Sequence, residues 1–177
     1  MTQYPDRKLV LFRHAKSAWP DVADHERPLA HRGQRAAPVM GRWLREAGCV
    51  PDQVLCSTAR RARETWELAQ PGLGAAPPVT FDHSVYEASA AGLLALARQV
   101  APAVGTLLVI GHNPAIEELA LMLAVAPGGT GAAGDPAERM LAKFPTAAVA
   151  VLEFTGSWRA LGPGEARLAA FVTPRDA

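Results

Sequence analysis

Imidazole and guanidinium side chains follow two short apolar segments of the chain. The segment 9–12 ends in Arg13 and His14, and the segment 106–110 is followed, after one glycine, by His112. A short apolar run bounded by charge is typical of a buried strand, and open α/β sheets bind ligands at the carboxyl ends of their strands. Arginine grips anionic oxygens with paired hydrogen bonds, and imidazole can act as nucleophile, base or acid. These residues predict a site for an anionic substrate, and a surface arginine–histidine pair is the alternative.

A third apolar segment supports the first interpretation. The segment 53–56 leads through Ser57 into a helix that begins with Arg60 and Arg61. Parallel strands share one carboxyl edge, so three such strands would bring two histidines and at least one further arginine to one place. That combination predicts a phosphate site with a nucleophile.

The order of elements predicts the fold that positions these residues. Alternating strands and helices favour a three-layer α/β/α sandwich around a mostly parallel sheet of about six strands. The last two strands are expected to form a hairpin-like pair that supplies one antiparallel edge strand. A Gly- and Ala-rich segment, 127–136, is expected to be a surface loop. The expected strands are 8–12, 53–56, 79–82, 106–110, 147–154 and 167–172, and the expected helices are 33–47, 59–69, 89–100 and 114–125.

Length and charge limit the classes of protein to consider. A chain of 177 residues fits one domain, and its net charge of +1 gives no electrostatic case for binding nucleic acid or a membrane surface. The chain begins with polar residues and has no apolar run of transmembrane length, so we expect a cytoplasmic protein without a signal peptide. Cys49 and Cys56 are too few for a disulfide framework and are expected to be packing residues.

Six short motifs, taken together, resemble the histidine phosphatase superfamily and, more narrowly, the SixA-like phosphohistidine phosphatases. They are Arg13-His14, Arg27-Pro28-Leu29 with Arg32-Gly33, Arg61-Ala62-x-x-Thr65, Val109-Ile110-Gly111-His112-Asn113-Pro114, Lys143-Phe144-Pro145-Thr146, and Phe171 through Asp176. The resemblance spans nearly the whole chain and implies a single histidine-phosphatase domain, 1–177. It also implies hydrolysis of phosphohistidine on a protein, without a cofactor or metal, through a transiently phosphorylated histidine.

The resemblance assigns roles to particular residues. His14 is the expected nucleophile, and Arg13 and Arg61 are the expected phosphate clamp. Arg61 is chosen over Arg60 and Arg63, which are expected to be solvated, because it precedes Ala62 and lies four residues before Thr65. His112 is expected to hold the phosphate opposite His14. The alternative is that His112 only caps the helix that follows it.

Two further residues are candidates by the same resemblance. Arg27 is expected near the substrate, with an outer ion pair as the alternative. Glu87 is the candidate general acid and base, with an exposed helix-terminal acid as the alternative. Two positions depart from the pattern: Ala15 replaces the usual glycine, and Pro20 replaces an asparagine of the phosphoglycerate mutases, which disfavours mutase activity.

Other functions remain open at this stage. The same site would suit a small-molecule phosphomonoesterase, and a non-catalytic module that binds phospho-ligands is a weaker alternative. A metal-dependent hydrolase is disfavoured because His25, His31 and His83 lack partners at metal-ligand spacing. Larger relatives that act on small substrates insert a segment after the third strand, and the short connection here predicts an uncovered pocket suited to a phosphoprotein.

Overall fold

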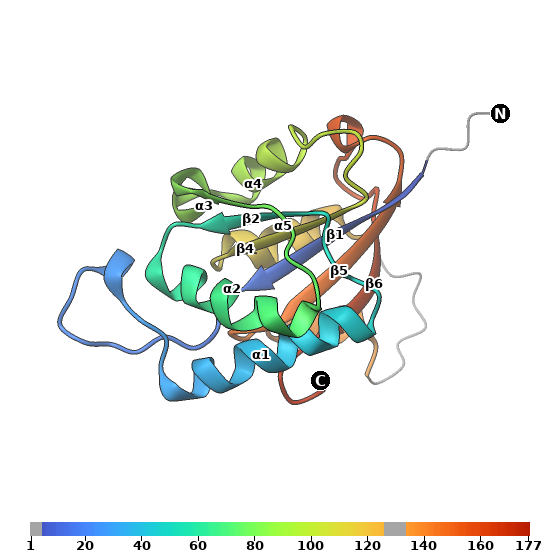
Figure 1. The fold of residues 1–177 in the computed structure, drawn as a ribbon. Helices are drawn as coiled ribbons and strands as arrows, with labels where there is room; N and C mark the ends of the chain where they lie inside the picture. The colour runs from blue at the N-terminus through green and yellow to red at the C-terminus, as the bar shows by residue number, and fades with distance from the viewer. Residues whose placement is uncertain (1–4, 126–133) are drawn as a thin grey trace.

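The computed structural model describes residues 5–125 and 134–177. Most of the predicted loop 127–136 lies outside these residues. Within them, six strands form one sheet in the order β3-β2-β4-β1-β5-β6 (Figure 1). The strands are β1 (Asp6–Arg13), β2 (Gln53–Ser57), β3 (Val79–Asp82), β4 (Thr106–Gly111), β5 (Val149–Thr155) and β6 (Arg167–Val172).

The sheet confirms the predicted α/β class and its mostly parallel pairing. Strands β1, β2, β3 and β4 pair in parallel, whereas β5 pairs antiparallel with both β1 and β6. The single reversed strand is therefore β5, inside the sheet, and the edge strand β6 again runs in the direction of β1. The predicted position of the antiparallel strand at the edge was wrong, because the second strand of the hairpin adds outside the first.

Six α-helices are described: α1 (His31–Glu46), α2 (Arg60–Leu73), α3 (His83–Glu87), α4 (Ala90–Ala97), α5 (Ala115–Leu123) and α6 (Pro136–Ala142). Helices α1 and α2 lie side by side against one face of the sheet (Figure 1), and the residues of α3, α4, α5 and α6 join the core on the other face. The alternation within β1 shows why both faces are apolar. Leu9 and Leu11 belong to the core beneath α4 and α5, and Val10 and Phe12 belong to the core beneath α1 and α2.

Glycines let α1 approach its neighbours closely. A Cβ at Gly41 would lie 2.0 Å from the carbonyl oxygen of Ala69 in α2, and a Cβ at Gly33 would lie 2.2 Å from the carbonyl oxygen of Lys16. The second contact fixes the start of α1 against the segment that follows His14, which gives a physical reason for a glycine at position 33.

Several helix boundaries differ from those predicted. Helix α2 continues past Pro71 to Leu73, because a proline in the last turn removes only one hydrogen bond, and Gly74 ends the helix with φ of 68°. Helices α3 and α6 were not predicted. Each is one or two turns long and is capped by an aspartate: Asp82 accepts from the Ser84 N–H and Asp135 from the Ala137 N–H. Among the described residues, no helix is both long and apolar enough to cross a membrane.

The strand register aligns the carboxyl ends of three neighbouring strands, where the candidate residues lie. Arg13 at the end of β1 pairs with Gly111 at the end of β4, and Cys56 near the end of β2 pairs with Ile110. The carboxyl ends of β1, β2 and β4 therefore lie together at one edge of the sheet, as the sequence predicts.

Candidate active site

His14 and His112 meet at this edge. The N–H of His14 donates to the carbonyl oxygen of Gly111 at 3.0 Å, which extends the β1–β4 ladder by one residue. The two imidazole rings lie 5.1 Å apart between centroids, tilted by 50°. Residues separated by almost 100 positions in the sequence thus form one pair.

The surroundings of His14 keep its ring neutral and orient it. Its Nδ1 lies 2.7 Å from the carbonyl oxygen of Ala15. A carbonyl can only accept, so Nδ1 carries the proton and Nε2 carries the lone pair. Burial, together with the charges of His112, Arg61 and Arg13, lowers the pKa of His14 to about 3, against the weaker opposing effect of the Ala15 carbonyl. His14 is a neutral imidazole with an available Nε2 at neutral pH.

Thr65 holds the segment after His14 in place. Its hydroxyl donates to the carbonyl oxygen of Arg61 at 2.6 Å and accepts from the N–H of Ala15 at 3.0 Å. Thr65 is fully buried, so these bonds are protected from water. The spacing Arg61-Ala62-x-x-Thr65 therefore has a physical basis: one turn of α2 presents the arginine, and the next fixes the backbone beside His14.

Arg61 is oriented by Asp24, which lies in a 3-10 helix, Asp24–Glu26. Its Nη1 donates to the Asp24 carbonyl oxygen at 2.8 Å and its Nη2 to Oδ2 of the same residue at 3.0 Å. The hydroxyl of Tyr86 donates to that Oδ2 at 2.7 Å. The hydrogen bond from the Tyr86 hydroxyl is the largest cause that holds the pKa of Asp24 well below its usual range, with Arg27 and Arg61 adding to it against the opposing effect of burial. Asp24 is thus an ionised carboxylate that fixes the arginine.

Arg13 approaches the site from the end of β1. Its Nη1 donates to the carbonyl oxygen of Phe144 at 2.8 Å, and its Nε is buried without a hydrogen-bond partner among the described residues. Burial lowers its pKa, but an arginine stays protonated at neutral pH. A buried guanidinium nitrogen without an acceptor is what an oxyanion would satisfy.

His112 is held by Ser57 at the end of β2. The Nε2 of His112 lies 2.7 Å from the Ser57 hydroxyl oxygen, and Nδ1 is buried without a partner among residues 5–125 and 134–177. Burial is the main cause that lowers the pKa of His112 to about 4, and the Arg61 charge adds to it. The Tyr86 ring packs against this imidazole in a T-shaped arrangement, with the centroids 5.5 Å apart. His112 is also a neutral ring, placed opposite His14.

A sequence model described as "Histidine phosphatase superfamily (branch 1)" matches residues 9–99, just over half of the chain. This chain belongs to the histidine phosphatase superfamily. It is a phosphatase of that superfamily, and the cluster around His14 is its candidate catalytic centre.

Relatives of this histidine phosphatase include both sequences and solved structures. It is 46% identical over 164 residues to the uncharacterized protein Rv1276c of Mycobacterium tuberculosis, an alignment that covers 92% of this chain and 99% of the relative. The Nakamurella multipartitia protein assigned as phosphohistidine phosphatase SixA superimposes with a TM-score of 0.84 at 31% identity, over 97% of this chain and 98% of the other. The Agrobacterium tumefaciens protein with the same assignment gives a TM-score of 0.75 at 27% identity, over 97% and 99%. Both similarities place the phosphatase in the SixA-like group.

Arg27 lies beside this centre. Its Nη1 donates to Asp24 Oδ1 at 3.1 Å, its Nη2 to the Ser17 hydroxyl at 2.6 Å and its Nε to the Ala18 carbonyl oxygen at 3.0 Å. The guanidinium is buried and shares its carboxylate with Arg61. The ion pair expected as the alternative for Arg27 is present, and its role near the substrate stays a prediction.

Glu87 is not brought into contact with the histidine pair. It is the last residue of α3, its side chain is 71% exposed, and its Oε1 lies 3.5 Å from Nε2 of His83. Tyr86, one residue earlier, reaches Asp24 and His112 instead. A general-acid role for Glu87 stays a prediction.

Three residues of the site, Asp24, Ser57 and Tyr86, had no predicted side-chain role, although Ser57 was expected at this strand end. Asp24 precedes Arg27 by three residues, and this short polar pair was the one available signal. Arg60 and Arg63 are exposed as expected, and Arg60 pairs with Glu64. Among the described residues, no group of three or more histidine, cysteine, aspartate or glutamate side chains could hold a metal ion.

A cysteine lies directly behind the site. Cys56 precedes Ser57 in β2, is fully buried, and donates its thiol to the Ser57 carbonyl oxygen at 3.4 Å. Burial raises the pKa of this thiol far above its usual range. Cys56 is a packing residue, and Cys49 is likewise buried and free.

Proposed function

We propose that this protein hydrolyses phosphohistidine on a partner protein, in two steps and without a metal, through a phosphorylated His14. The observation that carries the proposal is the state of His14. Its Nδ1 proton is committed to the Ala15 carbonyl at 2.7 Å, so that Nε2 is a lone-pair nucleophile held beside His112 and Arg61.

In the first step, His14 Nε2 attacks phosphorus and the phosphorus–nitrogen bond of the substrate breaks. The electron pair stays on the leaving imidazole, which departs neutral when its other nitrogen carries a proton. The guanidinium groups of Arg13 and Arg61 stabilise the charge on the equatorial oxygens without reorganisation, because Phe144 and Asp24 already hold them. His112 is the proposed donor to the phosphoryl group from the opposite side.

In the second step, a water oxygen attacks phosphorus and the bond to Nε2 breaks. The electron pair returns to His14 Nε2, and both water protons leave with the phosphate. Glu87, at the exposed side of the site, is the proposed proton donor only where the leaving group is an alkoxide, which needs protonation more than an imidazole does.

The open surroundings of the centre favour a protein substrate. Between β3 and β4 the chain forms only the short helices α3 and α4, and the carboxylate side chain of Asp24 is 51% exposed. Sites that bind small ligands tightly bury most of the ligand. A phosphohistidine that projects from a partner's surface needs no such enclosure. The second candidate function, a small-molecule phosphomonoesterase, shares the catalytic residues but lacks this support.

The test compares substrates at equal enzyme concentration in the presence of EDTA. A histidine-phosphorylated phosphotransfer domain is expected to give a much higher kcat/KM than p-nitrophenyl phosphate or a sugar phosphate. Brief incubation with the labelled domain is expected to trap acid-labile phosphate on the wild type and on His31→Ala, and none on His14→Ala. His31 is an exposed histidine outside the site, so it is the matched control. Comparable kcat/KM on all substrates would favour the phosphomonoesterase, and activity restored by a divalent ion after EDTA would contradict the metal-free mechanism.

A further inference from the structure

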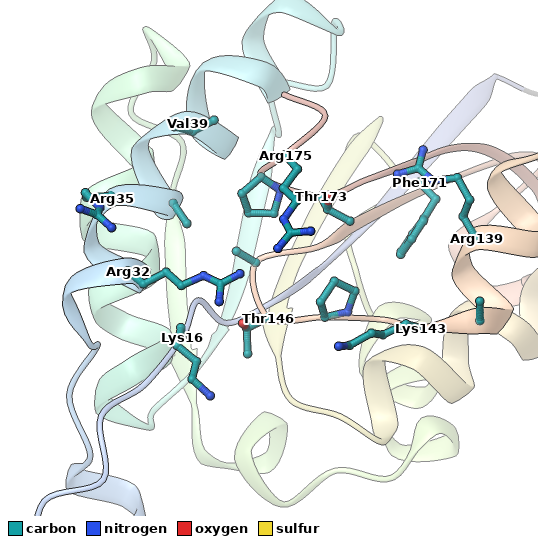
Figure 2. Close-up of a pocket in the computed structure, with 15 residues that line it drawn as sticks. Lys16, Arg32, Arg35, Val39, Arg139, Lys143, Thr146, Phe171, Thr173 and Arg175 are labelled. Atoms are coloured by element: carbon teal, nitrogen blue, oxygen red, sulfur yellow. The ribbon is translucent and has the colours of Figure 1, made fainter. Parts of the chain in front are cut away.

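A second concave site lies beside the catalytic edge. This pocket has a volume of about 660 Å³ and is bounded by α1, by the segment 139–147 and by the segment 171–175 (Figure 2). His14, Arg61 and His112 do not line it. Six cationic side chains do: Lys16, Arg32, Arg35, Arg139, Lys143 and Arg175.

The positive charge of this basic pocket is not neutralised. No aspartate or glutamate lines it, and of the six cations only Arg139 forms an ion pair, with Asp176, among the described residues. The undescribed segments 1–4 and 126–133 contain no acidic residue in the sequence. One third of the chain's 18 lysines and arginines thus line one pocket of a protein whose net charge is only +1. Such segregation creates a local positive potential that attracts anions.

Two of these cations lie at a helix N-terminus, where positive charge is unfavourable. Arg32 and Arg35 stand near the N-terminus of α1, the positive end of the helix dipole, and the first turn has no acidic residue to compensate. The contact of Gly33 with the Lys16 carbonyl holds this helix end close to Lys16. The arrangement is unfavourable for the isolated protein and favourable once an anion is bound.

The form of the basic pocket suits a small molecule rather than a flat surface. Its volume lies within the range of small-molecule pockets, and its walls include the apolar residues Val39, Pro145 and Phe171. Figure 2 shows Arg32 and Arg175 pointing toward one another, with Lys16 and Lys143 at the same mouth. Guanidinium groups that converge in this way can bind several phosphate oxygens in pairs.

We propose that the basic pocket binds a polyphosphate group, either as inorganic polyphosphate or as part of a nucleoside triphosphate, separately from the catalytic centre. The proposal does not depend on the proposed function. The pocket shares one wall with the active site, because the segment 143–147 holds Arg13 through the Phe144 carbonyl and bonds from Ala147 N–H to the carbonyl oxygens of Arg13 and His14. The two sites are nevertheless lined by different side chains.

Titration calorimetry with tripolyphosphate, ATP and orthophosphate in magnesium-free buffer tests the proposal. The titrations are run with and without tungstate, a phosphate mimic added to compete at the catalytic centre. The double substitution Arg32→Gln/Arg175→Gln is expected to weaken tripolyphosphate binding about tenfold or more, since each lost charged hydrogen bond is costly. Arg42→Gln/Arg45→Gln removes the same charge from exposed positions further along α1, outside the pocket, and is expected to change the affinity less than about twofold.

Each outcome bears on the proposal. Tighter binding of ATP than of tripolyphosphate would support a nucleotide site that uses the apolar wall, and equal affinities would support a site for the polyphosphate alone. Orthophosphate is expected to bind most weakly in both cases. The proposal is overturned by equal weakening in the two double variants, or by no binding of either polyanion at about 1 mM in the absence of tungstate.

Discussion

Two groups of cations flank the segment 143–147, and they differ in how their side chains are held. In the candidate catalytic centre, Arg61 is fixed by Asp24 and Arg13 by the Phe144 carbonyl, and both lie close to the imidazole of His14. In the basic pocket, Arg32 and Arg175 are exposed and without ion-pair partners among the described residues. Fixed charges stabilise one transition state without reorganisation, whereas free charges adapt to ligands of different shape. The fixed arginines around His14 therefore suit catalysis, and the free arginines of the basic pocket suit ligand binding.

The largest expected effect is at His14, the proposed nucleophile. His14→Ala is expected to lower kcat on a histidine-phosphorylated domain by about 10⁴-fold or more, because the covalent route is lost. Circular dichroism should show an unchanged fold. Activity near that of the wild type would mean that His14 is not the nucleophile, and the cluster around His14 could then not be called a catalytic centre.

The next effect separates a fixed arginine from its exposed neighbour. Arg61→Ala is expected to lower kcat by about 10²–10³-fold through loss of charge stabilisation in the transition state. Arg60→Ala, which removes only an exposed ion pair to Glu64 at 2.7 Å, is expected to stay within about twofold. Steady-state kinetics on both variants measure the difference in kcat. Equal losses of kcat would show that Arg61 has no special role compared with Arg60.

A third prediction concerns pH and stability. The pKa of His14 is about 3 in the folded protein and about 6.5 when unfolded, so the unfolded state binds the extra proton between these values. The contribution of His14 to the free energy of unfolding is therefore expected to be fully present above pH 6.5 and to be lost as the pH is lowered toward 3. The His14 contribution is about 1.4 kcal/mol per pH unit inside this window. Urea unfolding at several pH values should show a shallower slope for His14→Ala than for the wild type, and identical slopes would mean that His14 is not buried as a neutral ring.

The smallest effect is expected in the basic pocket. Arg32→Gln/Arg175→Gln is expected to leave hydrolysis of p-nitrophenyl phosphate unchanged and to raise the free energy of unfolding by a few tenths of a kcal/mol (about 0.3), since repulsion and the unfavourable helix-dipole contact are reduced. Thermal unfolding at low salt measures the change. A clear loss of stability would mean that these arginines have structural partners and would weaken the contrast with the catalytic centre.

Local sequence patterns were enough to predict which residues lie at the carboxyl ends of the strands. Apolar runs that stop at Arg13, Ser57 and His112 are enough to place these residues at one sheet edge, because parallel strands share their carboxyl edge. The position of β5 was not predictable in the same way. The order of strands across a sheet depends on which edge a hairpin joins, and no local pattern within 149–155 records that.

Long-range polar contacts were also beyond the sequence. Asp24 and Tyr86 lie 62 positions apart, and neither belongs to an apolar pattern. The choice between Tyr86 and Glu87 depends on the rotation of the five-residue helix α3, because adjacent residues of a helix face different directions. Proline and glycine between 127 and 136 obscured α6, although Asp135-Pro136 is a recognisable helix start once the helix is known.

The buried thiol of Cys56 has a consequence for the conditions under which this phosphatase can work. Oxidants attack exposed thiolates, and Cys56 is neither exposed nor ionised. The proposed nucleophile, His14, is an imidazole, which is not part of the thiol oxidation series. The proposed reaction therefore uses no thiol, and we expect the phosphatase to stay active at peroxide concentrations that inactivate cysteine-dependent phosphatases.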